Sequence, residues 1–348
     1  MTQTLAPESS PTVAPGRRSA TTRVVWVLVT LGLLALAVLA SVAFGARVVG
    51  WSDVVNGLGG ASDTIGEAAV SKRIPRTLLA LLVGASLGLA GAVMQGVTRN
   101  PLADPGILGV TTGASLAVVT GIAFFGLASP SSYIWVAIAG AALAAGFVYA
   151  IGSLGRGGAT PLKLALAGAA TSAAFSSLVS AILLPRVDVM DTFRFWQIGG
   201  VGGASYAKMT QVLPFLVVGA LLCLATARGL NSLALGDDVA AGLGENVTVT
   251  RLLAAVGAVT LCGAATAVAG PIGFVGLVVP HLCRLLIGID HRWLLPMSAL
   301  LGAVLLTAAD VVGRVIARPE EIDVGIITAF LGAPVFIYIV RRQKVRAL

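Results

Sequence analysis

Two side chains have the types that nucleophilic catalysis would need. Ser86 lies at the centre of Gly84-Ala-Ser-Leu-Gly88, which matches the G-x-S-x-G pattern of a nucleophile elbow, and His281 lies in another apolar run. An elbow requires a sharp turn from strand to helix that exposes its serine. Here the string lies inside an apolar segment, where small residues usually serve helix packing. An intramembrane serine hydrolase is therefore kept only as the less favoured alternative.

One acidic residue, Asp310, lies well inside an apolar segment (296–316). Ionisable groups are costly within a bilayer and are by default candidates for function. Asp310 could bind a proton or cation in an ion-coupled secondary transporter. It could instead hold helices together by hydrogen bonding near the membrane edge, four residues before Arg314. We favour the structural role and keep the ion-coupled transporter as an alternative.

Three arginines are placed where membrane topology does not explain them. Arg73 and Arg76 flank Pro75 immediately before an apolar segment, and Arg314 ends another. On the topology predicted below all three face outward, against the usual enrichment of Lys and Arg on the cytoplasmic side. They could contact anionic lipid headgroups. They could also dock acidic residues of an external partner, because guanidinium groups pair well with carboxylates.

Several other chemistries lack their motifs. No Gly-Lys pair occurs, so the chain has no P-loop, and ATP would have to bind to another chain. Cys223, Cys262 and Cys283 lie in apolar stretches without C-x-x-C spacing, so we expect neither a metal site nor disulfides. We expect no cofactor on this chain. The Lys and Arg residues that give the net charge of +8 are scattered through short loops, which argues against nucleic-acid binding.

The segments that position these residues are predominantly apolar. The 348 residues are 57% apolar and only 11% charged, whereas soluble domains carry about 25% charged residues. Roughly 20 apolar residues are needed to cross a bilayer as a helix. We also expect Gly84-x-x-x-Gly88 and Gly109-x-x-x-Gly113 to allow close helix packing. The composition predicts an integral membrane protein of the all-α, polytopic class.

Ten transmembrane helices are predicted, with both termini in the cytoplasm. An even number of spans places the termini on one side, and a tail rich in Lys and Arg (341–346) favours the cytoplasm. Residues 1–22 are predicted to form a disordered cytoplasmic tail and 23–343 one permease domain. The predicted spans lie near 24–45, 77–97, 107–127, 134–153, 164–184, 211–227, 251–269, 272–288, 296–316 and 324–340.

A cytoplasmic stretch between two spans (228–250) is long enough to have its own role. The apolar residues there are spaced as in a short amphipathic helix, and two adjacent acids lie near its N-terminal end. The residues that we single out are Leu233, Leu235, Gly236, Asp237, Asp238, Ala240, Leu243 and Gly244.

Several motifs together resemble the permease family of ABC importers for ferric siderophores, haem and cobalamin. The resemblance covers roughly residues 24–343, and its motifs follow in the expected order. They are Arg73-Ile-Pro-Arg-Thr-Leu-Leu-Ala-Leu-Leu-Val-Gly84, Gly91-Ala-Val-Met-Gln95, Arg99-Asn-Pro-Leu-Ala-Asp-Pro-Gly106, Leu235-Gly-Asp-Asp-Val-Ala-Ala-Gly-Leu-Gly244, Gly270-Pro-Ile-Gly-Phe-Val-Gly-Leu-Val-Val-Pro-His281 and Gly332-Ala-Pro-Val-Phe336.

The resemblance implies a transport subunit with several partners. Family members pair with a second permease, here a related chain or a second copy, and bind two cytoplasmic ATPases that carry ATP and Mg. An external binding protein delivers the cargo. In the family, arginines at the positions of Arg73, Arg76 and Arg314 engage acidic residues of that binding protein. The segment 233–244 corresponds to the loop that couples the permease to the ATPase.

The resemblance also implies a cargo and a location. The string 98–109 looks most like permeases that serve ferric siderophores, in the cytoplasmic (inner) membrane. Iron is carried within its chelator, so no protein metal ligands are expected. One departure is visible, because Asp323-Val-Gly325 stands where the family usually has a proline. An acid can cap a helix start, so we expect the last helix to form.

Overall fold

The structure is a computed structural model, which describes residues 19–127, 129–154 and 160–342. Its described residues form helices and connecting loops, without strands. Parts of the predicted tails, residues 1–18 and 343–348, lie outside the described residues. The helices are α1 (Ala20–Ala43), α2 (Trp51–Leu58), α3 (Ile65–Thr98), the 3-10 helix η1 (Pro105–Leu108), α4 (Val110–Phe125), α5 (Pro130–Ser153), α6 (Pro161–Leu183), α7 (Val187–Gln197), α8 (Tyr206–Ala225), α9 (Ala227–Leu233), α10 (Asp237–Gly242), α11 (Val247–Ala269), α12 (Val275–Ile287), α13 (His291–Ile316) and α14 (Val324–Arg342).

The predicted all-helical membrane fold is confirmed. Seven helices are long and apolar enough to cross a membrane, namely α1, α3, α5, α6, α8, α11 and α13. The other three predicted spans also appear as helices, α4, α12 and α14, but their apolar parts are shorter. Each of the ten predicted spans therefore has a helix, while the count of ten crossings stays a prediction.

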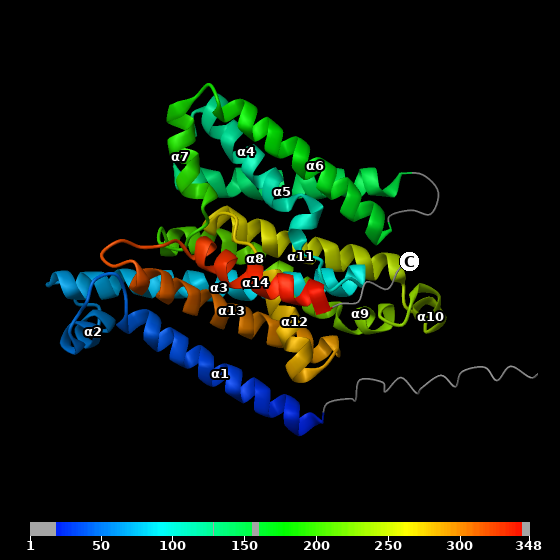
Figure 1. Cartoon of the computed structure of the whole chain (residues 1–348), viewed down its shortest axis with the longest axis horizontal. Helices are drawn as coiled ribbons and strands as arrows, with labels where there is room; N and C mark the ends of the chain where they lie inside the picture. Colours follow the sequence, from blue (N-terminus) through cyan, green and yellow to red (C-terminus); the bar gives the residue numbers. More distant parts are fainter. Residues whose placement is uncertain (1–18, 128, 155–159, 343–348) are drawn as a thin grey trace, which may run out of the picture.

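The bundle has two distinct ends (Figure 1). At one, which we call the α2 end, lie α2, α7 and the loop before α14. At the other, the α10 end, lie α9 and α10, together with the first residues of α1 and the last turn of α14. The placement of α1 and α14 agrees with termini on one side of the membrane, and the predicted orientation makes the α10 end cytoplasmic.

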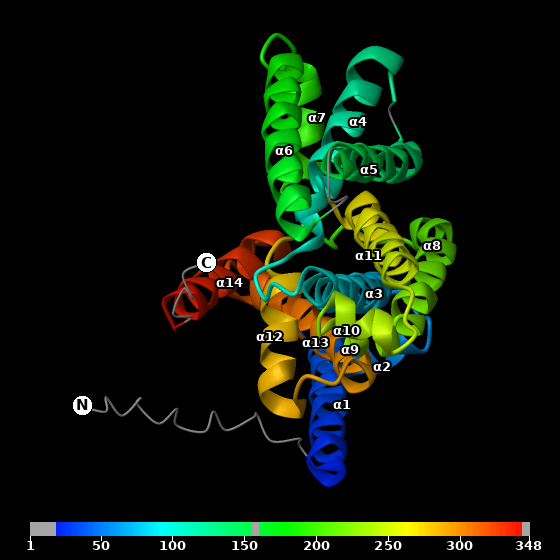
Figure 2. The same ribbon diagram turned by 90° about the vertical axis from the view of Figure 1, so that its right-hand side faces the viewer.

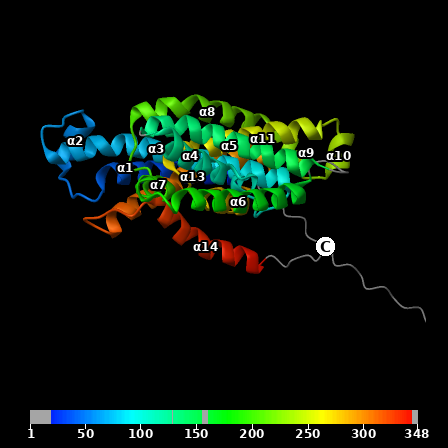
Figure 3. The same cartoon turned by 90° about the horizontal axis from the view of Figure 1, so that it is seen from above.

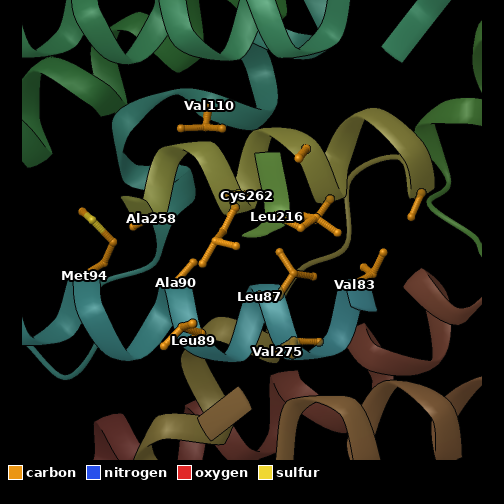
Figure 4. Close-up of a cluster of buried hydrophobic side chains, with 14 of the residues drawn as sticks. Val83, Leu87, Leu89, Ala90, Met94, Val110, Leu216, Ala258, Cys262 and Val275 are labelled. Atoms are coloured by element: carbon orange, nitrogen blue, oxygen red, sulfur yellow. The ribbon is translucent and has the colours of Figure 1, made fainter. Parts of the chain in front are cut away.

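Helix α3 is the centre of the bundle and packs against α13, α11 and α12. Its interface with α11 is filled by small and medium apolar side chains, among them Ala90, Ala258 and Cys262 (Figure 4). Helices α4, α5 and α6 form a second group beside this centre, and α14 runs along the edge of the bundle (Figures 2 and 3).

Glycines let α3 and α13 approach closely, as the Gly84-x-x-x-Gly88 spacing predicts. A Cβ atom at Gly84 would lie 2.4 Å from the carbonyl oxygen of Gly302, and one at Gly88 would lie 2.2 Å from that of Ser298. Gly113 likewise faces α5, where a Cβ would meet Ala144 at 2.2 Å. Gly109 differs, because its φ of 69° places it in the turn between η1 and α4, a conformation that glycine adopts easily.

Two helices at the α2 end, α2 and α7, were not predicted. Each is short and lies in a segment between spans, so neither gives a membrane-length apolar signal. Helix α2 is followed by the capped start of α3, where Thr64 and Glu67 form a capping box. Helix α14 begins at Val324, directly after Asp323, so its expected formation is confirmed.

Candidate functional sites at the two ends of the bundle

At the α2 end, Arg73 of α3 binds the last carbonyl groups of α1. Its Nη1 donates to the carbonyl oxygens of Val42 and Ala43, both at 2.9 Å, and its Nη2 donates to that of Arg47 at 2.6 Å. The carbonyls of Val42 and Ala43 lack helical partners because a helix leaves its last four unpaired. Gly45 makes room, since a Cβ there would lie 2.7 Å from the guanidinium.

Arg314 reaches the same helix end from α13. Its Nη1 donates to the carbonyl oxygens of Ser41 (3.0 Å) and Phe44 (3.1 Å), and its Nη2 donates to the Ser41 hydroxyl at 2.7 Å. Only 1% of Arg314 is exposed. Arg73 and Arg314 together therefore tie α1 to α3 and α13.

The third arginine, Arg76, forms an ion-pair network with Asp310. Its Nε and Nη2 donate to Asp310 at 3.0 and 2.8 Å, and its Nη1 donates to Glu321 at 2.6 Å. Arg314 Nη2 lies 3.0 Å from the other oxygen of Asp310. The carboxylate of Asp310 is fully buried and lies between two guanidinium groups. We call Arg73, Arg76, Asp310 and Arg314 the arginine cluster.

The geometry of the arginine cluster is relevant to two suggested functions, ion coupling at Asp310 and docking of an external partner by the three arginines. Two guanidinium groups compensate the charge of Asp310, which favours the structural role over a site for a transported cation. The structure brings the three predicted docking arginines together at one end of the molecule. Arg73 and Arg314 are buried and donate to internal acceptors. The side chain of Arg76 is 12% exposed and lies at the rim of the arginine cluster, where it pairs with the more exposed Glu321. Docking on these residues stays a prediction.

At the α10 end, the predicted amphipathic segment forms α9, a turn and α10. Gly236 and Gly244 bracket α10 with φ angles of 109° and 83°, a backbone region that disfavours other residues. Leu233 and Ala240 are buried against the bundle, and Ala234 to Gly236 form the turn. The segment is thus anchored by two apolar side chains and shaped by two glycines.

Three other apolar side chains of the α9–α10 segment face away from the helix bundle. Leu235, Val239 and Leu243 are between 51% and 65% exposed, and we call them the α10 apolar face. Asp237 holds the helix start in place: Arg251 donates to it at 2.8 Å, and Arg99 also pairs with it. Asp238 is exposed beside it. A short helix fixed at its base and apolar on its outer side is suited to binding another protein.

A polar contact that the sequence did not predict joins α3 to α12. Pro280 has no N–H group, so it cannot donate to the carbonyl of Gly276 four residues earlier. Gln95 Nε2 donates to that carbonyl at 3.2 Å, and its Oε1 accepts from Arg284 at 2.5 Å. The sequence did contain an indication of this contact. Gln95 is a polar residue in an apolar span, and the span that contains Pro280 leaves a backbone carbonyl without its helical partner.

Replacing Gln95 with Leu should lower the thermal stability of the folded protein. The change leaves the Gly276 carbonyl and the Arg284 guanidinium without this partner, at a cost of about 1–3 kcal/mol for each unsatisfied group. Fluorescence-detected size-exclusion chromatography of the detergent-solubilised protein after a heating series would measure the shift. Gln211→Leu is the matched control, because the Oε1 of that glutamine accepts no hydrogen bond from the described residues. An equal midpoint for both variants would contradict the assigned role.

The serine of the elbow-like motif is part of a continuous helix. Gly84–Gly88 lies inside α3, and the Ser86 hydroxyl donates to the carbonyl of Leu82 at 2.7 Å. The strand-to-helix turn that an elbow requires is therefore replaced by helix at this position. His281 lies on α12. No group of three or more His, Cys, Asp or Glu side chains suited to a metal lies within the residues that the structure describes.

A bundle of apolar helices with a fixed, outward-facing amphipathic helix at one end is the architecture of a polytopic membrane protein. Comparison with known proteins gives the family. Residues 33–342 match the model of the FecCD transport family, so the chain belongs to that family.

Two relatives and a solved structure agree. The chain is 45% identical to the ferric enterobactin transport system permease protein FepD of Escherichia coli (strain K12), with 93% of this chain and 97% of that protein covered. It is 42% identical to the probable siderophore transport system permease protein YfiZ of Bacillus subtilis (strain 168), with 91% and 96% covered. A solved inward-facing structure of a metal-chelate type ABC transporter matches with a TM-score of 0.79 and 30% identity, over 92% of this chain and all of that one.

Proposed function

We propose that the chain is the permease subunit of a binding-protein-dependent ABC importer in the cytoplasmic membrane, and that its cargo is a ferric siderophore. The observation that carries the proposal is the α10 apolar face, which is held out by two glycines at the predicted cytoplasmic end. The chain has no P-loop of its own, so we assign this face as the surface that binds a separate ATPase. The two siderophore-transport relatives described above support the cargo.

The α10 segment transmits motion from the ATPase in this proposal. Leu235, Val239 and Leu243 insert into an apolar groove of the ATPase, while Leu233 and Ala240 bind the segment to the bundle. Asp237 links the segment to α3 and α11 through Arg99 and Arg251. Movement of the ATPase, where ATP and Mg bind, would thus pull on both helices.

A second permease chain completes the importer. Helix α14 lies at the edge of the bundle and carries exposed apolar side chains, among them Ile326, Phe330 and Ile337. These residues fit a partner permease, either a related chain or a second copy, with surrounding lipid. The cargo path lies between the two permeases, and the iron stays in its chelator.

The external binding protein docks at the α2 end. We assign the direct contact to Arg76, which is at the rim and already pairs with the exposed Glu321. Arg73 and Arg314 shape the same surface from beneath, through the end of α1. An acidic residue of the binding protein would replace Glu321 as the partner of Arg76, because guanidinium groups bind carboxylates in a defined geometry.

Replacing Arg73 and Arg76 together with Glu should weaken binding-protein association while the ATPase stays attached. Affinity for the binding protein is expected to fall at least about thirtyfold, since loss of the charge-assisted contact of Arg76 costs roughly 2 kcal/mol. Co-purification measures both partners at once. Recovery of folded protein is measured first, because Arg76 is also a partner of the buried Asp310. Arg76→Glu alone then tests direct contact, with Arg73 still bound to the end of α1. Lys72→Glu, an exposed charge on the same helix, is the control. Unchanged association in the double variant would reject docking at the arginine cluster.

Uptake of labelled ferric siderophores, haem and cobalamin by cells with and without this chain tests the cargo. We expect deletion to abolish uptake of one ferric siderophore and ATP depletion to have the same effect. Loss of haem or cobalamin uptake instead would change the cargo and keep the importer. Uptake that follows the ion gradient and ignores ATP would favour the ion-coupled alternative.

A further inference from the structure

A large cavity opens at the α10 end of the bundle and is lined by residues of α1, α3, α9, α12 and α13 and of the loops beside them. Its volume is about 1100 Å³. The proposed contact with the ATPase uses the α10 apolar face and shares only Leu235 with the cavity lining. The lining residues are Arg23, Gln95, Gly96, Arg99, Pro101, Asn231, Ala234, Leu235, Arg284, Leu285, Gly288, Ile289, Asp290, His291 and Arg292.

The lining has an excess of positive charge. Four arginines contribute to it, against one carboxylate, that of Asp290. Arg99 already pairs with Asp237 outside the cavity, and Arg23 lies 3.4 Å from Asp290. Arg284 hydrogen-bonds to the neutral Gln95, and the Arg292 side chain is exposed. The single Asp290 carboxylate is therefore shared by Arg23 and Arg292, and Arg284 pairs with an amide rather than an acid.

Asp290 is committed to other partners, which limits how far it can neutralise the cavity. Its Oδ1 accepts from Asn231 Nδ2 at 2.8 Å and from the backbone N–H of Arg292 at 3.1 Å. These hydrogen bonds lower the pKa of Asp290 although partial burial acts in the opposite direction. The carboxylate thus stays ionised and is held by its hydrogen bonds, with Arg23 and Arg292 as its nearby positive charges.

Two tryptophans lie next to cavity residues. Trp26 follows Arg23 by one turn, and Trp293 follows His291 by two residues, with its ring 5.9 Å from the Arg23 guanidinium. Tryptophan is enriched at membrane–water interfaces. Leu285 and Ile289 line the cavity and are largely exposed, so an apolar surface lies next to the cationic one.

From this arrangement we infer that the cavity binds the phosphate headgroup of an anionic phospholipid of the inner leaflet. Arg23, Arg284 and Arg292 face the phosphate, and Leu285 with Ile289 contacts the first part of the acyl chains. Basic pockets between transmembrane helices on the cytoplasmic side are suited to such headgroups. A bound lipid would join α1, α12 and the start of α13 at the end where α9 also attaches.

Native mass spectrometry of the purified full-length chain tests this inference. Phosphatidylglycerol and phosphatidylcholine with identical acyl chains are added separately, and inorganic phosphate is added as a competitor. We expect phosphatidylglycerol to bind more tightly and to resist an equal concentration of phosphate. Arg292→Gln should weaken its binding about fivefold, and adding Arg23→Gln should weaken it further by a similar factor.

Arg228→Gln is the control, because this exposed arginine lies on α9 at the same end but outside the cavity lining. Its affinity for phosphatidylglycerol should match that of the parent chain. Arg292 is exposed, so its variant should keep the elution volume of the folded protein even if the double variant does not. Equal binding of the two lipids, equal weakening by Arg228→Gln, or displacement by inorganic phosphate would each overturn the assignment.

Discussion

Replacing Asp310 with Ala is expected to remove most of the folded protein from the membrane. The carboxylate is fully buried between Arg76 and Arg314, and its loss leaves two guanidinium groups without their shared counter-charge. Removing one partner of a buried ion pair costs about 3–5 kcal/mol, which is a large part of the stability of most domains. The measurement is the amount of monodisperse protein recovered from membranes, compared with the parent chain.

Glu321→Ala is the matched control, since it removes an exposed partner of the same Arg76. Exposed ion pairs contribute about 0–1 kcal/mol, so this variant should be recovered nearly as well as the parent. Asp310→Asn separates the structural role from ion coupling. Recovery of the Asp310→Asn variant at the parental level, but without transport, would contradict the structural role and support a coupled ion at Asp310.

Placing two carboxylates on the α10 apolar face, by Leu235→Glu with Leu243→Glu, should strongly reduce transport without affecting folding. Both leucines are exposed, so the free chain tolerates the change. The ATPase groove would have to bury two charges in place of two leucines, and burying an unpaired charge costs several kcal/mol. We expect ATPase co-purification and uptake to fall at least about tenfold, while binding-protein association is retained.

Ala241→Glu carries the same charge on the same helix but outside the α10 apolar face. The residue is exposed and lies two positions from Val239, so its side chain points to another side of α10. ATPase association should therefore survive in this variant. Normal co-purification of the double variant would show that the ATPase is held elsewhere on the α10 end.

The helices of the ten predicted spans could be predicted from the sequence because each comes from an apolar run much longer than the loops of a soluble protein contain. The sequence predicted α10 as well, since Gly236 and Gly244 mark its boundaries and Leu233 and Ala240 repeat on one side. It missed α2 and α7, whose short segments give only local signals. Their formation depends on caps and on contacts with neighbouring helices.

The environment of the three arginines could not be derived from the sequence. Their spacing shows that Arg73 and Arg76 leave one helix near the same level. It does not show that the carbonyl end of α1 lies within reach of Arg73 and Arg314. That proximity arises from the packing of helices that are far apart in the chain. The pairing of Gln95 with the carbonyl opposite Pro280 has the same origin.

The two arginines that bind the end of α1 also restrict how the transporter can move. Arg73 comes from α3 and Arg314 from α13, so tilting any of these three helices against the others would break several hydrogen bonds. The parts of α1, α3 and α13 at the α2 end should therefore move as one rigid body. We therefore expect a hinge of the transport cycle to lie outside this body, such as between it and the group formed by α4, α5 and α6. Spin labels on α1 and α13 should keep a constant separation through the cycle, whereas a pair that spans α13 and α6 should not.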